Sequence, residues 1–143
     1  MGMVKVRQIT PDDLHALYLY WCDLEVLRSG LYRTPTPSCP RDEWLAATSS
    51  MSGWVAEEHV VMAGLLYTQA GANAAVQHLV VDIHHAQSRA LGAALWQAAV
   101  AAWRAAGVCQ VQANAKQRLP VEDAFWRACG AETVEGRYVV SLC

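Results

Sequence analysis

The stretch from Val76 to Gly107 restricts the possible folds of this chain more than any other. It opens with a mainly apolar run, Val76 to Val81, in which β-branched residues fill three of six positions, as in a buried strand. A polar connection, Asp82 to Ser88, follows, and a long helix rich in Ala, Leu and Trp begins near Arg89. The first N–H groups and the dipole of a helix attract anions. This strand-loop-helix unit therefore predicts an anion site at its centre.

Hydrophobic periodicity and turn residues predict the other elements of the chain. Strands are expected over 4–9, 53–57, 60–67, 76–81, 108–113, 132–134 and 137–142, and helices from Thr10 to near Arg28, over 41–47, from Arg89 to Gly107 and from Pro120 to Gly130. Strand, helix and strand at this spacing form a right-handed βαβ unit, so strands 76–81 and 108–113 should run parallel. The prediction is one α/β (α+β) domain over residues 1–143. A helical bundle or a ferredoxin-like domain is the alternative, but neither explains the strand-loop-helix polarity at Gln87.

Composition and charge narrow the class of protein. Hydrophobic residues make up 54% of the 143 positions and charged residues 17%, which excludes a disordered chain. The net charge of −2 offers no electrostatic case for a nucleic acid or an anionic membrane as partner. No apolar run approaches the roughly 20 residues of a membrane span, and the first ten residues lack a signal-peptide core. We therefore expect a cytoplasmic protein.

The cysteines predict reduced thiols. There are five of them, at Cys22, Cys39, Cys109, Cys129 and Cys143. The number is odd and no C-x-x-C pair occurs, so neither a disulfide framework nor a structural zinc site is expected, and no metal ligand set is evident.

Two fragments of the sequence resemble motifs of the GCN5-related N-acetyltransferase (GNAT) superfamily. Gln87–Gly92, Q-S-R-A-L-G, is similar to the acyl-CoA pyrophosphate motif Q/R-x-x-G-x-G/A, with Ala90 in place of the first glycine. Residues 124–131, A-F-W-R-A-C-G-A, are similar to A-x-F-Y-x-x-x-G-F, and Asn114 precedes them. The resemblance implies a mixed, mostly antiparallel sheet whose central parallel pair splays into a V, flanked by about four helices.

The resemblance also implies acetyl-CoA as the co-substrate. Backbone N–H groups from Ser88 to Ala93 are expected to hold its two phosphates, and the pantetheine arm is expected to pair with the strand edge at Leu79 to Val81. The residues expected to contact it are Leu79, Val80, Val81, Gln87, Ser88, Arg89, Ala90, Leu91, Gly92, Ala93, Asn114 and Trp126.

The implied reaction is acetyl transfer to a primary amine of a small molecule or peptide by direct attack. His78 occupies a position where many relatives carry a glutamate base, and an ordinary imidazole pKa of about 6.5 suits that role. Its alternative role is a core-facing histidine bonded to a backbone carbonyl. Trp126 stands where the family often has a tyrosine acid, and an indole cannot supply that proton. Trp126 and Ala90 favour the functional alternative, a GNAT-fold module that binds acyl-CoA or a protein partner with little turnover.

Aromatic residues leave two further questions open. Tyr18, Trp21 and Tyr32 lie in the region that GNAT proteins use for the acceptor, so they are expected either to line the acceptor side or to pack in the core. A second apolar stripe on the long helix, Trp96, Val100 and Trp103, predicts either a helix sandwiched inside the domain or a homodimer contact.

Overall fold

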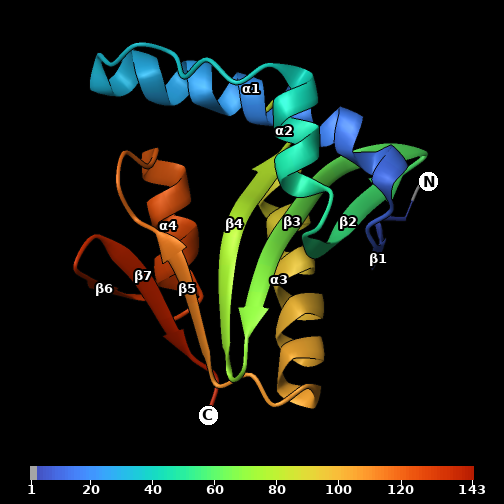
Figure 1. The fold of residues 1–143 in the computed structure, drawn as a ribbon, viewed down its shortest axis with the longest axis vertical. Coiled ribbons are helices and arrows are strands. Elements are labelled where there is room, and N and C mark those ends of the chain that lie inside the picture. Colours follow the sequence, from blue (N-terminus) through green and yellow to red (C-terminus); the bar gives the residue numbers. More distant parts are fainter. Residues whose placement is uncertain (1–2) are drawn as a thin grey trace.

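The computed structural model describes residues 3–143, in which helices cover both faces of a seven-stranded sheet (Figure 1). The strands are β1 Lys5–Gln8, β2 Ser52–Glu58, β3 Val60–Ala70, β4 Asn73–Val81, β5 Gln110–Asn114, β6 Glu132–Val134 and β7 Arg137–Ser141. The helices are α1 Leu14–Tyr32, α2 Arg41–Thr48, α3 Ser88–Ala105 and α4 Pro120–Ala128, and a 3₁₀ turn at Pro11–Asp13 precedes α1. Within the described residues only β4 and β5 pair in parallel, which confirms the predicted mixed, mostly antiparallel sheet.

The strands lie in the order β1-β2-β3-β4-β5-β7-β6, and the sheet separates the core into two layers. On one face α1 and α2 pack against the sheet around Leu17, Trp44 and Val80. On the other face α3 and α4 pack against it around Leu95 and Trp126. Because α1 and α3 lie on opposite faces, any space lined by both must pass through the sheet.

The parallel pair opens along its length, as predicted. β4 pairs with β5 only from Asn73 to Val76, opposite Gln110 to Ala113, although β4 continues to Val81. A register shift between Leu66 and Tyr67 of β3 marks a bulge in the neighbouring β3–β4 ladder just where the pairing with β5 stops. The remaining edge of β4 has no β5 partner, so the two strands form a V-shaped opening, which we call the seam (Figure 1).

Helix α1 runs further than predicted. The expected end near Arg28 is wrong, because the helix passes through Ser29 and Gly30 and stops at Tyr32. Arg33 then takes a left-handed backbone conformation, and its N–H donates to the Ser29 carbonyl. A glycine inside a helix costs only about 1 kcal/mol, and the contacts of the buried Arg28 side chain offset it.

The second apolar stripe of α3 lies inside the domain. Trp103 is 1% exposed, and the Trp96 ring contacts both Trp103 and Trp126 at centroid distances of 5.7 and 5.4 Å. These rings fill the layer between α3, α4 and the sheet. The sandwiched helix accounts for this stripe within one chain, and the homodimer contact stays a prediction.

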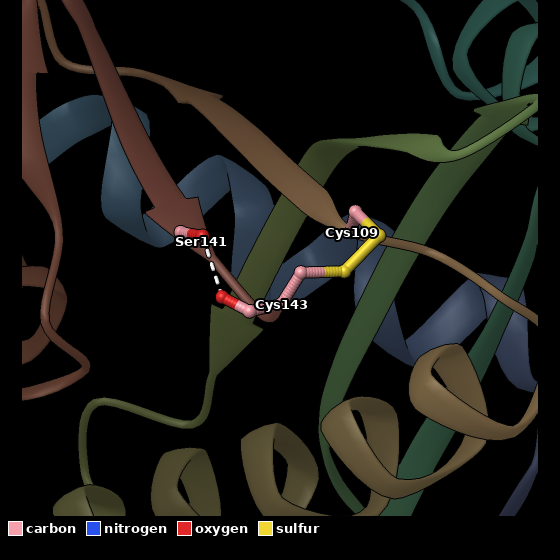
Figure 2. The surroundings of a disulfide bond; sticks show 3 residues. All are labelled: Cys109, Ser141 and Cys143. Atoms are coloured by element: carbon pink, nitrogen blue, oxygen red, sulfur yellow. Dashed lines mark hydrogen bonds between the residues drawn. A yellow bond between two sulfur atoms is a disulfide. The ribbon is translucent and has the colours of Figure 1, made fainter.

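The prediction of five reduced thiols is wrong for two of them. Cys109 and Cys143 form a disulfide with a Cα–Cα distance of 5.0 Å (Figure 2). They are 34 residues apart, but β5 and β7 are antiparallel neighbours with Gln110 opposite Ser141, which brings the flanking cysteines together. Cys22, Cys39 and Cys129 are free and half-buried. No helix among residues 3–143 has the length and apolar character that a membrane span requires.

Candidate active site

A cavity of about 500 Å³ occupies the seam and reaches both faces of the sheet. At one end, which we call the α3 end, it is lined by Ser88, Arg89, Gly92 and Ala93. At the other, the α1–α4 end, it is lined by Leu24, Leu27, Arg118 and Glu122. Between the two ends lie Leu79 and Val81 of β4, Asn114 of β5 and Trp126 of α4. The cavity thus brings together most of the residues predicted to bind the coenzyme.

The first turn of α3 keeps two N–H groups free. Gln87 N–H donates to Nδ1 of His85 at 3.0 Å, and Ser88 N–H donates to the His85 carbonyl at 3.3 Å. The Leu91 N–H donates to the Gln87 carbonyl at 3.1 Å. Among the described residues nothing accepts the N–H of Arg89 or Ala90. Two unpaired donors and the positive end of the helix dipole therefore lie at the α3 end, where an anion would be stabilised.

The glycine of the motif has a packing role that the sequence did not reveal. Gly92 is buried, and a Cβ built on it would lie 3.4 Å from Cε2 of Phe125. The Cβ of an alanine would thus be in ordinary van der Waals contact with this ring, and only a side chain that extends beyond Cβ would have to displace it. Leu91, predicted alongside it, has its side chain fully buried in the core and does not line the cavity.

The open edge of β4 also presents backbone donors. Asp82 N–H donates to the Met62 carbonyl of β3 at 2.8 Å. Since the N–H groups of a strand alternate between its two edges, that of Val80 also faces β3, whereas those of Leu79 and Val81 face the seam. The Val80 side chain points to the face of the sheet that α1 covers, where it packs in the core. Of these three predicted residues, Leu79 and Val81 line the cavity.

Trp126 and its neighbours provide no acid. Trp126 is 4% exposed and stacks on Tyr138 at a centroid distance of 5.6 Å. Burial and the hydrogen bond that the Tyr138 hydroxyl donates to Asp123, at 2.7 Å, both raise the pKa of this tyrosine. Asn114 lines the cavity, and its Oδ1 accepts the Lys116 N–H at 2.9 Å, which shapes the turn after β5.

A buried ion pair builds the α1–α4 end. Arg28 of α1 is 8% exposed, and its Nε donates to Oε1 of Glu122 at 2.9 Å. Its terminal nitrogens pair with Glu122 and Glu25. Burial opposes ionisation of Glu122, but the bonds from Arg28 outweigh burial and lower its pKa. Sequence reasoning missed this pair because its members are 94 residues apart and belong to no motif.

His78 lies in an aromatic cluster on the α1 side of the sheet. Its ring is 5.3 Å from that of Trp44 and 6.4 Å from that of Trp21, centroid to centroid. Burial, and then the charges of Arg28 and Arg118, lower its pKa to about 4. No hydrogen bond to its ring is found among residues 3–143, so the alternative of a histidine bonded to a carbonyl is not what the structure has. At neutral pH the imidazole is uncharged and a weaker base than the sequence implied.

The three aromatic residues predicted on the acceptor side do not share one place. Tyr18 and Trp21 stack at 6.1 Å and line a second cavity of about 320 Å³ under the loop that precedes α2. Tyr32 lies 14 residues beyond Tyr18 along α1, a distance of about 21 Å at the rise of a helix. Its hydroxyl donates to the Arg118 carbonyl, so Tyr32 supports the α1–α4 end.

The adjacent histidines of the connection before α3 do not gather metal ligands. His84 is exposed, and His85 holds the start of α3 through the two hydrogen bonds described above. Within residues 3–143 no group of three or more His, Cys, Asp or Glu side chains is placed to hold a metal ion.

Comparison with known proteins identifies the architecture. No family model matches the sequence, and no curated protein matches it. An N-acetyltransferase from Staphylococcus aureus Mu50 superposes with a TM-score of 0.76 at 15% identity, over 99% of this chain and 100% of the other. The chain has the GNAT fold. The ribosomal-protein-S18-alanine N-acetyltransferase from Escherichia coli superposes at 0.73 and 13% identity, over 98% of this chain and 94% of the other.

A further GNAT-fold structure bears on the coenzyme. The PaiA N-acetyltransferase from Thermoplasma acidophilum, solved in complex with coenzyme A, superposes with a TM-score of 0.71 at 11% identity, over 96% of each chain. At these identities the similarity shows the fold alone. The fold that the Gln87–Gly92 resemblance implied is confirmed.

Proposed function

We propose that this protein is an acetyl-CoA-dependent N-acyltransferase that moves an acetyl group to a primary amine. The observation that carries the proposal is that the open edge of β4 and the first turn of α3, which has two free N–H groups, meet at one cavity. Arg89 lines this cavity, whereas Gln87 and Ala90 do not. The edge of β4 is suited to an extended ligand that replaces β5 along the seam, and the start of α3 is suited to an anion. Acyl-CoA combines both features in one molecule.

The residues present fit this co-substrate. The N–H groups of Arg89 and Ala90 bind the diphosphate, the Arg89 guanidinium adds positive charge, and the side chains of Ser88 and Ala93 leave room for it. The seam-facing N–H groups of Leu79 and Val81 bind the pantetheine arm and the acyl carbonyl, where they stabilise developing negative charge. Acetyl-CoA supplies the acyl group as an activated thioester.

Proton transfer is the weakest part of the machinery. His78 is the proposed base. Its imidazole is uncharged at physiological pH but does not line the cavity, so a proton from the amine would reach it through water. A pKa of about 4 makes it a poor acceptor, so turnover is slow and favours amines that arrive unprotonated. The Trp126 indole offers no proton to the leaving group.

These two residues also favour a second candidate function. A GNAT-fold module that binds acyl-CoA, and signals or docks without efficient turnover, needs the cavity but neither a good base nor an acid. Trp126 and the low basicity of His78 are the observations that support it.

Two measurements decide between these functions. Isothermal titration calorimetry with acetyl-CoA is expected to give a one-to-one complex, and the absence of binding at millimolar concentration would eliminate both functions. Release of free CoA is then followed with a panel of primary amines. Release with any amine supports the enzyme, and binding without release over the whole panel supports the module. His78→Ala is expected to lower the release rate at every pH, whereas an unchanged rate would remove His78 from the mechanism.

A further inference from the structure

Arg118 is an incompletely satisfied cation in the cavity wall. It lies in the loop between β5 and α4 and lines the α1–α4 end. Its Nε is buried and has no hydrogen-bond partner within residues 3–143. Its only ion-pair contact there is a long one, 3.4 Å from Nη1 to Oε2 of Glu122. A buried guanidinium N–H without an acceptor is costly. The terminal Nη2 also has no acceptor among residues 3–143 but is not buried, so it is the nitrogen that a ligand can reach.

The surrounding carboxylates are already engaged. Glu122 and Glu25 both pair with Arg28, and of these two only Glu122 lines the cavity. Asp13, at the start of α1, pairs with Arg7 at 2.9 Å. Burial is the main cause of the low pKa of His78, and the charges of Arg28 and Arg118 lower it further.

The backbone holds Arg118 in place. The Tyr32 hydroxyl donates to its carbonyl, and the Leu119 N–H donates to Oε1 of Glu122 at 2.9 Å. Both contacts tie the loop to α1 and to the start of α4. The walls around it are apolar, formed by Leu24, Leu27 and Val121. A fixed guanidinium in an apolar wall is suited to a carboxylate, which guanidinium binds through paired hydrogen bonds.

We infer that the acceptor amine carries a carboxylate which Arg118 binds, and that the acceptor belongs to the class of amino acids with an apolar side chain. This inference rests on the proposed function and names its substrate class. The carboxylate accepts from the unpaired Nη2 of Arg118, and the apolar side chain packs on Leu24, Leu27 and Val121.

The test compares ligands that differ only in the carboxylate. N-acetyl-leucine and N-acetyl-leucinamide are titrated by calorimetry into the protein saturated with CoA, because neither probe has an amine to titrate and neither needs turnover. The acid is expected to bind about 10- to 100-fold more tightly than the amide, the range of a hydrogen bond to a charged group. In the Arg118→Gln variant this preference is expected to vanish, and in Arg118→Lys to persist in part. Arg104→Gln, an exposed arginine at the end of α3, should retain it.

The outcomes separate this inference from the proposed function. If CoA binds but the wild-type protein binds the amide as tightly as the acid, the inference is wrong and the proposed function stands. A preference that Arg118→Gln leaves intact contradicts the inference as well. Failure of CoA itself to bind overturns the proposed function. Should Arg118→Gln fail to fold, the comparison of the two probes on the wild-type protein decides alone.

Discussion

The two ends of the cavity are built in opposite ways. The α3 end offers backbone N–H groups that nothing in the described chain accepts, beside small residues such as Gly92 and Ala93. The α1–α4 end is lined by apolar side chains together with Arg118 and Glu122, and Arg28, outside the lining, pairs with Glu122 and Glu25. Backbone donors bind the same ligand whatever the side chains are, whereas an ion-paired wall depends on each residue. The α3 end is therefore suited to a ligand that is recognised without regard to side-chain identity. The α1–α4 end is suited to a ligand that particular side chains select.

The largest effect should come from breaking the α1–α4 end. Arg28→Ala leaves the Glu122 carboxylate buried without its main partner, and loss of one member of a buried ion pair costs about 3–5 kcal/mol. The free energy of unfolding in urea measures this loss. The control is Arg127→Ala, which removes the exposed i,i+4 pair with Asp123 on the same helix that carries Glu122. Its loss should be much smaller, and equal losses in the two variants would show that burial of the Arg28 pair is unimportant.

The second effect is the loss of folding stability at low pH, which follows from the lowered pKa of His78 beside the α1–α4 end. The unfolded chain binds a proton at residue 78 below about pH 6.5, but the folded chain binds it only near pH 4. Stability is therefore fully present above about pH 6.5 and is lost as the pH falls toward 4, by about 2 kcal/mol at about pH 5. Urea unfolding at about pH 7 and about pH 5 measures this loss. In His78→Gln the difference between the two pH values should shrink by that amount, and an unchanged difference would contradict the lowered pKa.

The smallest effect on stability, with a distinct effect on binding, is expected at the α3 end. Ser88→Asp places a carboxylate in the first turn of α3, where the helix dipole stabilises it by about 0.3–1 kcal/mol. The same charge repels a diphosphate and should weaken acetyl-CoA binding by about tenfold or more. The matched control is Ala106→Asp, an equal charge at the other end of α3, which should lower stability slightly and leave affinity unchanged. Weaker acetyl-CoA binding in Ala106→Asp alone would place the anion site elsewhere.

The sequence predicted the α3 end better than the α1–α4 end for a physical reason. Strand, loop and helix N-terminus are neighbours in the chain, so the pattern from Val76 to Gly92 carries the geometry of the anion site. The Arg28–Glu122 pair joins residues 94 positions apart and has no local signature. The same holds for the Cys109–Cys143 disulfide, which depends on β7 lying beside β5.

Element boundaries were less predictable than element types. β4 begins at Asn73 rather than at Val76, because Ala74 and Ala75 are weak strand formers that pairing with both neighbours holds extended. The acid–base properties of the site were least predictable. An ordinary imidazole pKa was expected for His78, but burial in an aromatic cluster lowers this pKa to about 4. Such a shift depends on residues from α1, α2 and the β5–α4 loop.

The central claim is that one ligand spans the seam of β4 and the first turn of α3. Two-dimensional NMR of ¹⁵N-labelled protein during titration with acetyl-CoA tests it most directly, because it follows the individual backbone N–H groups. The amide resonances of Leu79, Val81, Arg89 and Ala90 are expected to shift most and together, with one apparent affinity. Shifts confined to other parts of the chain, or none at millimolar acetyl-CoA, would contradict the claim.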